Sequence, residues 1–217
     1  MTQQTNSKEL SDLIIRVEDV SSRILDMYPL QSTVAPALLL TSARPAEGKT
    51  TVALAMAKAM ALASGDPILL VDANFHKPGL AQIFNLEPSL GLADALRAPS
   101  DDKDLPNHLV GEGVSLICAG EDPLPLLLTR GQSIASFRER YTKDFRFVIF
   151  DGANSRMGGA ALAKHVDGVV LIIDAKATRR EVVNYAINDI RLHDGYLIGA
   201  VLNKSSRYIP SALYKSF

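Results

Sequence analysis

The sequence predicts an α/β fold in which helices flank a doubly wound, mostly parallel sheet. Short apolar runs alternate along the chain with segments of helical periodicity, and this order is typical of such folds. The runs are rich in Val, Ile and Leu and mostly lack polar alternation, as do strands that are buried on both faces. The expected strands are residues 37–40, 68–71, 114–118, 145–150, 169–173 and 197–202.

Three segments between these strands predict helices. Residues 49–64 are rich in Ala and are followed by Gly65, which is a common helix stop. Residues 132–143 place apolar side chains on one helical face. Thr178 and Glu181 have capping-box spacing before a helix that is expected to end near residue 193.

The length of 217 residues suits one domain, 1–217, with a helical extension at 1–35 and a short tail at 204–217. Residues 7–28 carry apolar side chains at helical spacing, which predicts a helix that packs on the sheet. A contact between copies in a homo-oligomer is the alternative for this helix.

Composition excludes several classes of function. The net charge is −1, which argues against nucleic acid as a partner. No apolar stretch approaches the roughly 20 residues that span a bilayer. The single cysteine cannot form an internal disulfide, which fits a cytoplasmic protein.

A phosphate-binding loop is predicted where the first strand leads into the helix at 49–64. The segment ends in Gly48-Lys49-Thr50, although Ala43 stands where the usual pattern opens with Gly. Backbone N–H groups and the positive helix end attract phosphate, while Lys49 reaches the β- and γ-phosphates and the Thr50 hydroxyl ligates Mg²⁺. The cofactors expected are therefore ATP or ADP with Mg²⁺. The expected nucleotide-binding residues in this loop are Pro45, Ala46, Glu47, Gly48, Lys49, Thr50 and Thr51.

Two carboxylates follow neighbouring strands. Asp72 ends the run at 68–71 and Asp151 ends the run at 145–150. Ligands of open α/β sheets bind at the carboxyl ends of the strands, and carboxylate oxygens are ligands of Mg²⁺. The expected metal ligands are Thr50, Asp72 and Asp151; a helix cap or turn is the alternative for each Asp taken alone.

These motifs together resemble the bacterial tyrosine kinases of capsule and exopolysaccharide synthesis, which are relatives of the Min and Par ATPases. Residues 41–51 resemble their phosphate loop, and residues 72–78 resemble their second Walker A motif. Asp151 matches the Walker B aspartate, and residues 199–203 resemble the late strand whose Asn, here Asn203, lies near the base. The matches run in order from residue 37 to residue 203.

The resemblance implies a cytoplasmic P-loop NTPase that acts as a tyrosine autokinase and regulates polysaccharide synthesis and export. It implies catalytic roles for Lys49 and Asp72, with Tyr208 or Tyr214 as phosphate acceptors. It also implies a separate membrane-embedded polysaccharide co-polymerase as the partner, which would recruit the chain to the inner face of the plasma membrane.

Several positions depart from the family pattern. Asn74 replaces the second Asp of the second Walker A motif, and His76 replaces an Arg. Gly152-Ala153-Asn154 follows Asp151 where the family usually has two prolines. Two alternatives therefore stay open: a nucleotide-switched ATPase or kinase-inactive interaction module, and a Min- or Par-type positioning ATPase. Arg44 supports the second, because it stands where those ATPases carry a signature lysine.

Overall fold

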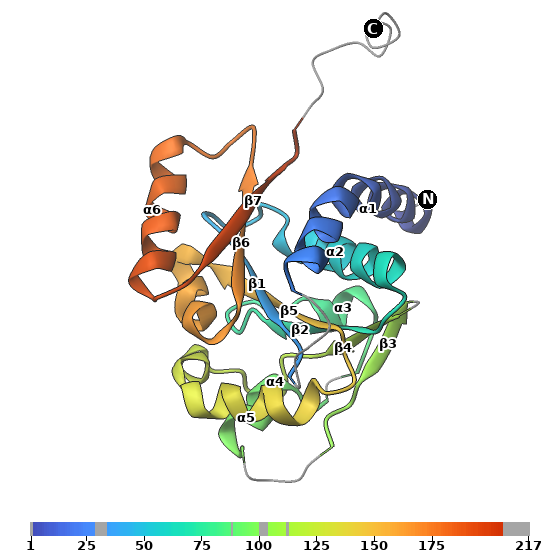
Figure 1. Cartoon of the computed structure of the whole chain (residues 1–217), viewed down its shortest axis with the longest axis vertical. Coiled ribbons are helices and arrows are strands. Elements are labelled where there is room, and N and C mark those ends of the chain that lie inside the picture. The colour runs from blue at the N-terminus through green and yellow to red at the C-terminus, as the bar shows by residue number, and fades with distance from the viewer. Residues whose placement is uncertain (1, 29–33, 88, 100–103, 112, 206–217) are drawn as a thin grey trace, which may run out of the picture.

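The computed structural model describes residues 2–28, 34–87, 89–99, 104–111 and 113–205. Within these residues, seven strands form one sheet in the order β3-β4-β2-β5-β1-β6-β7 (Figure 1). All neighbouring pairs are parallel except β3 and β4. The strands are β1 Ala37–Ser42, β2 Ile68–Ala73, β3 His108–Gly111, β4 Val114–Ile117, β5 Phe147–Asn154, β6 Gly168–Asp174 and β7 Leu197–Asn203. The doubly wound, mostly parallel sheet is confirmed.

Helices cover both faces of the sheet and divide the core into two apolar layers. One layer joins the sheet to α1 and α2, and the other joins it to α4, α5 and α6. The α-helices are α1 Thr2–Met27, α2 Lys49–Ser64, α3 Leu80–Ile83, α4 Leu92–Arg97, α5 Gly131–Tyr141 and α6 Arg180–Leu192. Short 3₁₀ helices are η1 Pro125–Thr129, η2 Ser155–Met157 and η3 Gly159–His165.

Two strands differ most from the sequence-based expectation; the other five agree with it to within two residues at each end. β3 was not predicted, because its four residues are partly exposed and pair antiparallel at the edge of the sheet. β5 was expected to end at residue 150, but it continues through Asp151 to Asn154, and all of its residues are buried. The two aspartates therefore lie within strand ends rather than after them.

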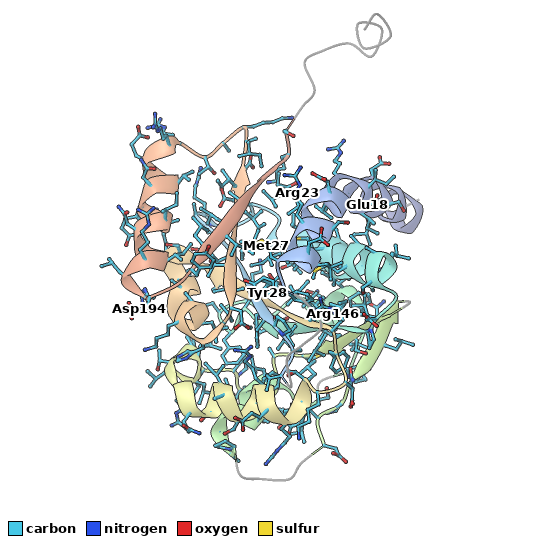
Figure 2. All side chains as sticks on the ribbon, viewed as in Figure 1. Glu18, Arg23, Met27, Tyr28, Arg146 and Asp194 are labelled. Atoms are coloured by element: carbon cyan, nitrogen blue, oxygen red, sulfur yellow. The ribbon has the colours of Figure 1, made fainter. Side chains whose placement is uncertain are left out.

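The N-terminal helix is confirmed, and it packs mainly on α2. Val17, Ser21 and Ile24 of this helix are buried. Tyr28 follows the helix, packs edge-on against Phe147 with ring centroids 5.6 Å apart, and donates its hydroxyl to the Asp167 carbonyl at 2.9 Å. Tyr28 also accepts a hydrogen bond from Arg146 through its backbone carbonyl, and both residues are labelled in Figure 2. Contacts with Phe147 of β5, with Arg146 just before it and with Asp167 just before β6 thus hold the segment that follows this helix.

Among the described residues, none of the helices has both the length and the apolar character that crossing a bilayer requires.

Candidate nucleotide and magnesium site

The fold brings the predicted phosphate loop and both aspartates to one edge of the sheet. β5 lies between β1 and β2, and Asp151 pairs with Leu40 of β1 and with Asp72 of β2. The loop that connects β1 to α2, residues 43–48, leaves the same edge. This is the position at which open α/β sheets bind their ligands.

The loop conformation explains why Gly48 precedes the helix. Gly48 has φ +88°, a left-handed conformation that costs little only for glycine. A Cβ at this position would lie 2.3 Å from Nδ2 of Asn203. Space and backbone conformation therefore both require glycine, and helix α2 begins directly after it at Lys49.

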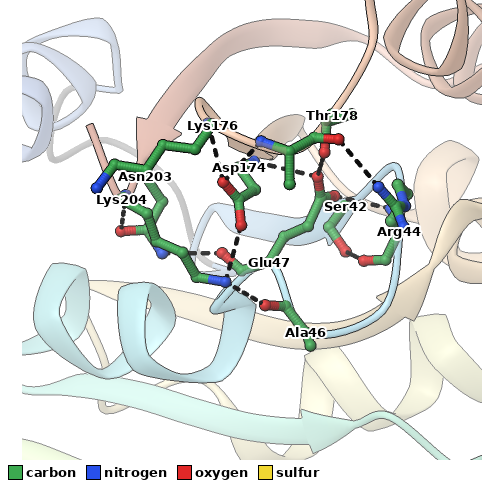
Figure 3. A network of polar contacts seen from close by, with 10 residues as sticks. Ser42, Arg44, Ala46, Glu47, Asp174, Lys176, Thr178, Asn203 and Lys204 are labelled. Carbon is green, nitrogen blue, oxygen red and sulfur yellow. Dashed lines mark hydrogen bonds and ion pairs between the residues drawn. The ribbon is translucent and has the colours of Figure 1, made fainter. Parts of the chain in front are cut away.

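Glu47 points away from the phosphate position and into the protein. Its side chain is 2% exposed, and it accepts hydrogen bonds from the Arg44 N–H at 2.7 Å, from the Asp174 N–H at 3.1 Å and from the Thr178 hydroxyl (Figure 3). Only its backbone is left to serve the nucleotide, so its side chain orders the loop. The expected capping box at Thr178 is wrong, because this hydroxyl donates to Glu47 and α6 begins without a side-chain cap.

The end of β7 holds the loop from a second side. The Nδ2 of Asn203 donates to the Glu47 carbonyl at 2.8 Å. The Nζ of Lys204 donates to the Ala46 carbonyl at 2.7 Å and to Oδ2 of Asp174 at 2.9 Å. The bond from Lys204 holds the pKa of Asp174 below its usual value. Lys204 was missed in the sequence; its position directly after Asn203 was the available signal.

Thr50 and Asp151 form the centre of the predicted magnesium site. The Thr50 hydroxyl donates to Oδ2 of Asp151 at 2.6 Å. Asp151 is 1% exposed, and its Oδ1 has no hydrogen-bond partner in the described part of the chain. Burial, and secondarily the charge of Asp72, raise the pKa of Asp151 to about 7. A hydroxyl oxygen beside a buried carboxylate with a free oxygen fits a Mg²⁺ ion, which would supply Lewis-acid stabilisation of phosphate charge.

Lys49 lies in the same buried region. It is 7% exposed, and its burial lowers the pKa of its ammonium group, while the nearby Asp151, Glu47 and Asp72 charges oppose that shift. Because the effect of burial on this pKa outweighs the effect of the three carboxylates, a further anion beside Lys49 would stabilise its charged ammonium group. A phosphate group is such an anion.

Asp72 is bound by the backbone of its own loop. Its Oδ1 accepts from the Asn74 N–H at 3.1 Å, and its Oδ2 accepts from the N–H groups of Gly79 at 2.9 Å and Leu80 at 3.0 Å. Burial raises the pKa of this carboxyl, and these three hydrogen bonds oppose the rise. A carboxylate has about four lone-pair sites, so little capacity is left for a metal. Its metal and catalytic roles stay predictions.

The remaining candidates lie around this centre. Arg44 is exposed and donates from its guanidinium to the Ala177 carbonyl of its own chain at 3.0 Å. Asn74 is half-buried, and His76 is exposed. Pro45, Ala46 and Thr51 are exposed on the loop and on the first turn of α2. Tyr208 and Tyr214 lie outside the described residues. Across the described ranges, no three His, Cys, Asp or Glu side chains gather as a metal site.

Sequence relatives of the chain are bacterial tyrosine kinases. CapB of Staphylococcus aureus is 28% identical over 170 residues, which cover 77% of this chain and 74% of CapB. The tyrosine-protein kinase YwqD of Bacillus subtilis is 28% identical over 169 residues, which cover 76% of this chain and 71% of YwqD. The chain is thus similar in sequence to bacterial tyrosine kinases over about three quarters of its length. No protein-family model matches it.

A third relative is a larger protein. The succinoglycan biosynthesis transport protein ExoP of Rhizobium meliloti is 26% identical over 178 residues, which cover 77% of this chain but only 22% of ExoP. The chain thus matches a small part of a polysaccharide transport protein, and it also matches most of the length of CapB and YwqD.

Solved structures confirm the fold of the bacterial tyrosine kinase type. The VpsO kinase domain superposes with a TM-score of 0.75 at 24% identity and covers 94% of this chain and 100% of that domain. The chimerical protein CapA2B2 gives a TM-score of 0.71 at 23% identity and covers 89% of this chain and 83% of that protein. A cobyrinic acid a,c-diamide synthase from Mycobacterium smegmatis, solved with ADP and magnesium, gives 0.61 at 19% identity and covers 77% and 74%. Nucleotide and divalent metal occur together on this fold.

Proposed function

We propose that the chain binds ATP with Mg²⁺ at the β1–α2 loop and transfers the γ-phosphoryl group to tyrosine in bacterial polysaccharide synthesis. The observation that carries the proposal is the hydrogen bond from Thr50 to Asp151 at the start of α2, beside the buried Lys49. Lys49 would neutralise the β- and γ-phosphates, and Thr50 and Asp151 would hold the metal. In the transfer, the tyrosine hydroxyl would give its proton to Asp72, its oxygen would bond to the γ-phosphorus, the bond from that phosphorus to the bridging oxygen would break, and ADP would leave with the bonding electron pair.

The sequence relatives support the setting of this reaction. CapB and YwqD are named as tyrosine-protein kinases and ExoP as a succinoglycan biosynthesis transport protein, which supports a cytoplasmic domain that works with a membrane-embedded polysaccharide co-polymerase. Such a partner would recruit the chain to the inner face of the plasma membrane, and the chain would act as a homo-oligomer. Tyr208 and Tyr214 are the proposed acceptors.

The experiment that tests this proposal is incubation of the full chain with ATP and Mg²⁺, followed by mapping of phosphotyrosine by mass spectrometry. Wild type is expected to carry phosphate on Tyr208 or Tyr214, and Lys49→Met is expected to lose it. Lys58→Met is the matched control, because Lys58 lies on the same helix away from its first turn. Wild-type protein that binds ATP in calorimetry but carries no phosphotyrosine would refute the kinase assignment.

A second function is favoured by the surroundings of Asp72. Asn74 carries no charge and cannot act as a base, and Asp72 already accepts three backbone hydrogen bonds. A nucleotide-switched interaction module, with slow hydrolysis and no phosphotransfer, would need neither residue as a base. Calorimetric ADP binding together with a change of oligomeric state between ADP and ATP, and no phosphotyrosine, would support this function over the kinase.

A further inference from the structure

Asn154 is the last residue of β5, and its amide oxygen is buried without a partner. The residue is 7% exposed, and no group in the described ranges bonds to its Oδ1. Buried polar atoms in native proteins are nearly always paired, so this exception requires an explanation. Neither the loop network around Glu47 nor the Thr50–Asp151 pair uses Asn154.

A bulge in β5 places the side chains of Asn154 and Asp151 on the same face of the sheet. Leu40 of β1 pairs with Asp151, and Ser42 pairs with Asn154. The chain therefore advances three residues along β5 where it advances two along β1, which means that β5 carries one extra residue here, as in a β-bulge. Leu40 and Ser42 are two residues apart and therefore share a face, and the residues that pair with them point the same way.

That shared face is the one that α2 covers. Leu40 packs in the apolar layer that contains α2, and Thr50 of α2 donates to Asp151. Ser42, the neighbour of Asn154, donates its hydroxyl to the Arg44 carbonyl in the phosphate loop at 2.7 Å. Asn154 is therefore directed toward the nucleotide side of the sheet.

The chemistry of the two free oxygens identifies the class of ligand. Oδ1 of Asp151 and Oδ1 of Asn154 are both acceptors, and both lack a partner among the described residues. Phosphate oxygens are acceptors too, and Asp151 would repel them. A hydrated Mg²⁺ ion keeps several of its waters when proteins bind it, and these waters donate hydrogen bonds.

We propose that Asn154 accepts a hydrogen bond from a water on the Mg²⁺ that Thr50 and Asp151 hold, and is a positioning residue for that metal. This inference rests on the proposed nucleotide and magnesium binding. The family that the chain resembles usually has proline near this position, and a proline side chain offers no acceptor. The role belongs to this chain's own residue.

The test is calorimetric titration of the full chain with ADP, once with Mg²⁺ and once with EDTA. Asn154→Leu keeps the branched shape and the number of heavy atoms of the side chain and removes the oxygen. It is expected to weaken ADP binding about tenfold or more with Mg²⁺ and to leave binding in EDTA unchanged. Its free energy of unfolding without nucleotide is expected to equal or exceed that of wild type, because an unpaired buried polar group is removed.

Two further variants make the result specific. Asn154→Asp keeps an acceptor oxygen and is expected to retain the Mg²⁺ dependence. Ser155→Ala is the matched control, because its buried hydroxyl donates to Asp189 of α6 at 2.9 Å and takes no part in the metal site. This control is expected to bind ADP like wild type under both conditions.

Several outcomes would overturn the inference: unchanged Mg²⁺ dependence in Asn154→Leu, equal weakening in EDTA, loss of stability without nucleotide, or failure of Asn154→Asp to retain the metal effect. Failure of the proposed function itself looks different. In that case wild type would bind ADP neither with Mg²⁺ nor in EDTA.

Discussion

The hydroxyl of Thr50 lies 2.6 Å from Oδ2 of Asp151, although 101 residues separate them in the chain. Thr50 is the second residue of α2, and Asp151 lies near the end of β5, so the bond joins the phosphate loop to the centre of the sheet. The hydroxyl donates to the carboxylate and still has lone pairs for a metal. The two candidate ligands are thus held together by the fold itself.

Thr50→Val tests whether this pair binds the metal. Val keeps the β-branched shape but removes the hydroxyl, so we expect the Mg²⁺-dependent part of ADP affinity to be lost. The change also leaves a buried carboxylate without its donor, which lowers the free energy of unfolding by about 1–3 kcal/mol. Calorimetry and urea denaturation measure the two effects. Thr50→Ser is the control and should restore both; a serine variant as defective as Thr50→Val would contradict the pairing.

The raised pKa of Asp151 predicts pH-dependent metal binding. Its pKa is about 7, so the carboxyl is largely protonated below that pH, and Mg²⁺ must then displace the proton. The Mg²⁺-dependent part of ADP affinity should therefore fall as pH decreases below about 7, by up to about tenfold per pH unit. ADP titrations at a series of pH values, with EDTA titrations as the control, measure this slope. A metal effect that stays constant across the range would show that Asp151 is charged throughout.

The same shift predicts how stability without ligands varies with pH. A carboxyl whose pKa is higher in the folded than in the unfolded chain binds more protons when folded. Its contribution to stability is greatest below the unfolded pKa of about 4 and is lost as pH rises to about 7. The difference in unfolding free energy between wild type and Asp151→Asn, measured by urea denaturation, should change in this range and level off above it. A constant difference would contradict the prediction.

Glu47→Gln tests the loop network. The carboxylate of Glu47 accepts from three donors, and an amide would turn an N–H toward one of them. We expect the free energy of unfolding to fall by about 1–3 kcal/mol, with weaker ADP binding because the loop is less ordered. Thr178→Val removes one of the donors, so the double variant should lose less than the sum of the single losses. Strictly additive losses in urea denaturation would show that the two residues do not interact.

The fold could be predicted from the sequence where burial is uniform. β2 and β6 are buried along their whole length, and apolar runs identify such strands. Helix α2 was predicted with its observed bounds, because Gly48 and Gly65 mark its ends in left-handed conformations. The edge strand β7 was also predicted although it is only partly buried, because its seven residues are mostly apolar. The other edge strand, β3, gives no such signal, because it has only four residues, of which His108 and Gly111 are not apolar strand formers.

The site residues could be predicted only where they form a motif of residues that are close together in the sequence. Gly48, Lys49 and Thr50 are adjacent in the chain, and Asp151 follows an apolar run. In contrast, Glu47 and Thr178 are 131 residues apart, and no local pattern pairs them. The spacing from Thr178 to Glu181 instead suggested a capping box, because local spacing cannot show that the hydroxyl has a distant partner. The continuation of β5 was hidden because Asp-Gly is also a common turn sequence.

The contact between Gly48 and Asn203 gives a final prediction. In Gly48→Ala the added Cβ would lie 2.3 Å from Nδ2 of Asn203, so this side chain must turn away and lose its 2.8 Å bond to the Glu47 carbonyl. The φ of +88° adds a penalty of about 1–2 kcal/mol for an L-residue. Urea denaturation should therefore show a loss of stability with two separable causes.

Asn203→Ala removes the obstructing amide, so the double variant should be more stable than the sum of the single losses predicts, by about 0.5–3 kcal/mol. The penalty from φ should persist in the double variant, which would leave it less stable than Asn203→Ala alone. Additive losses would mean that Asn203 does not lie over the phosphate loop, and a double variant as stable as Asn203→Ala would mean that the backbone at residue 48 carries no strain.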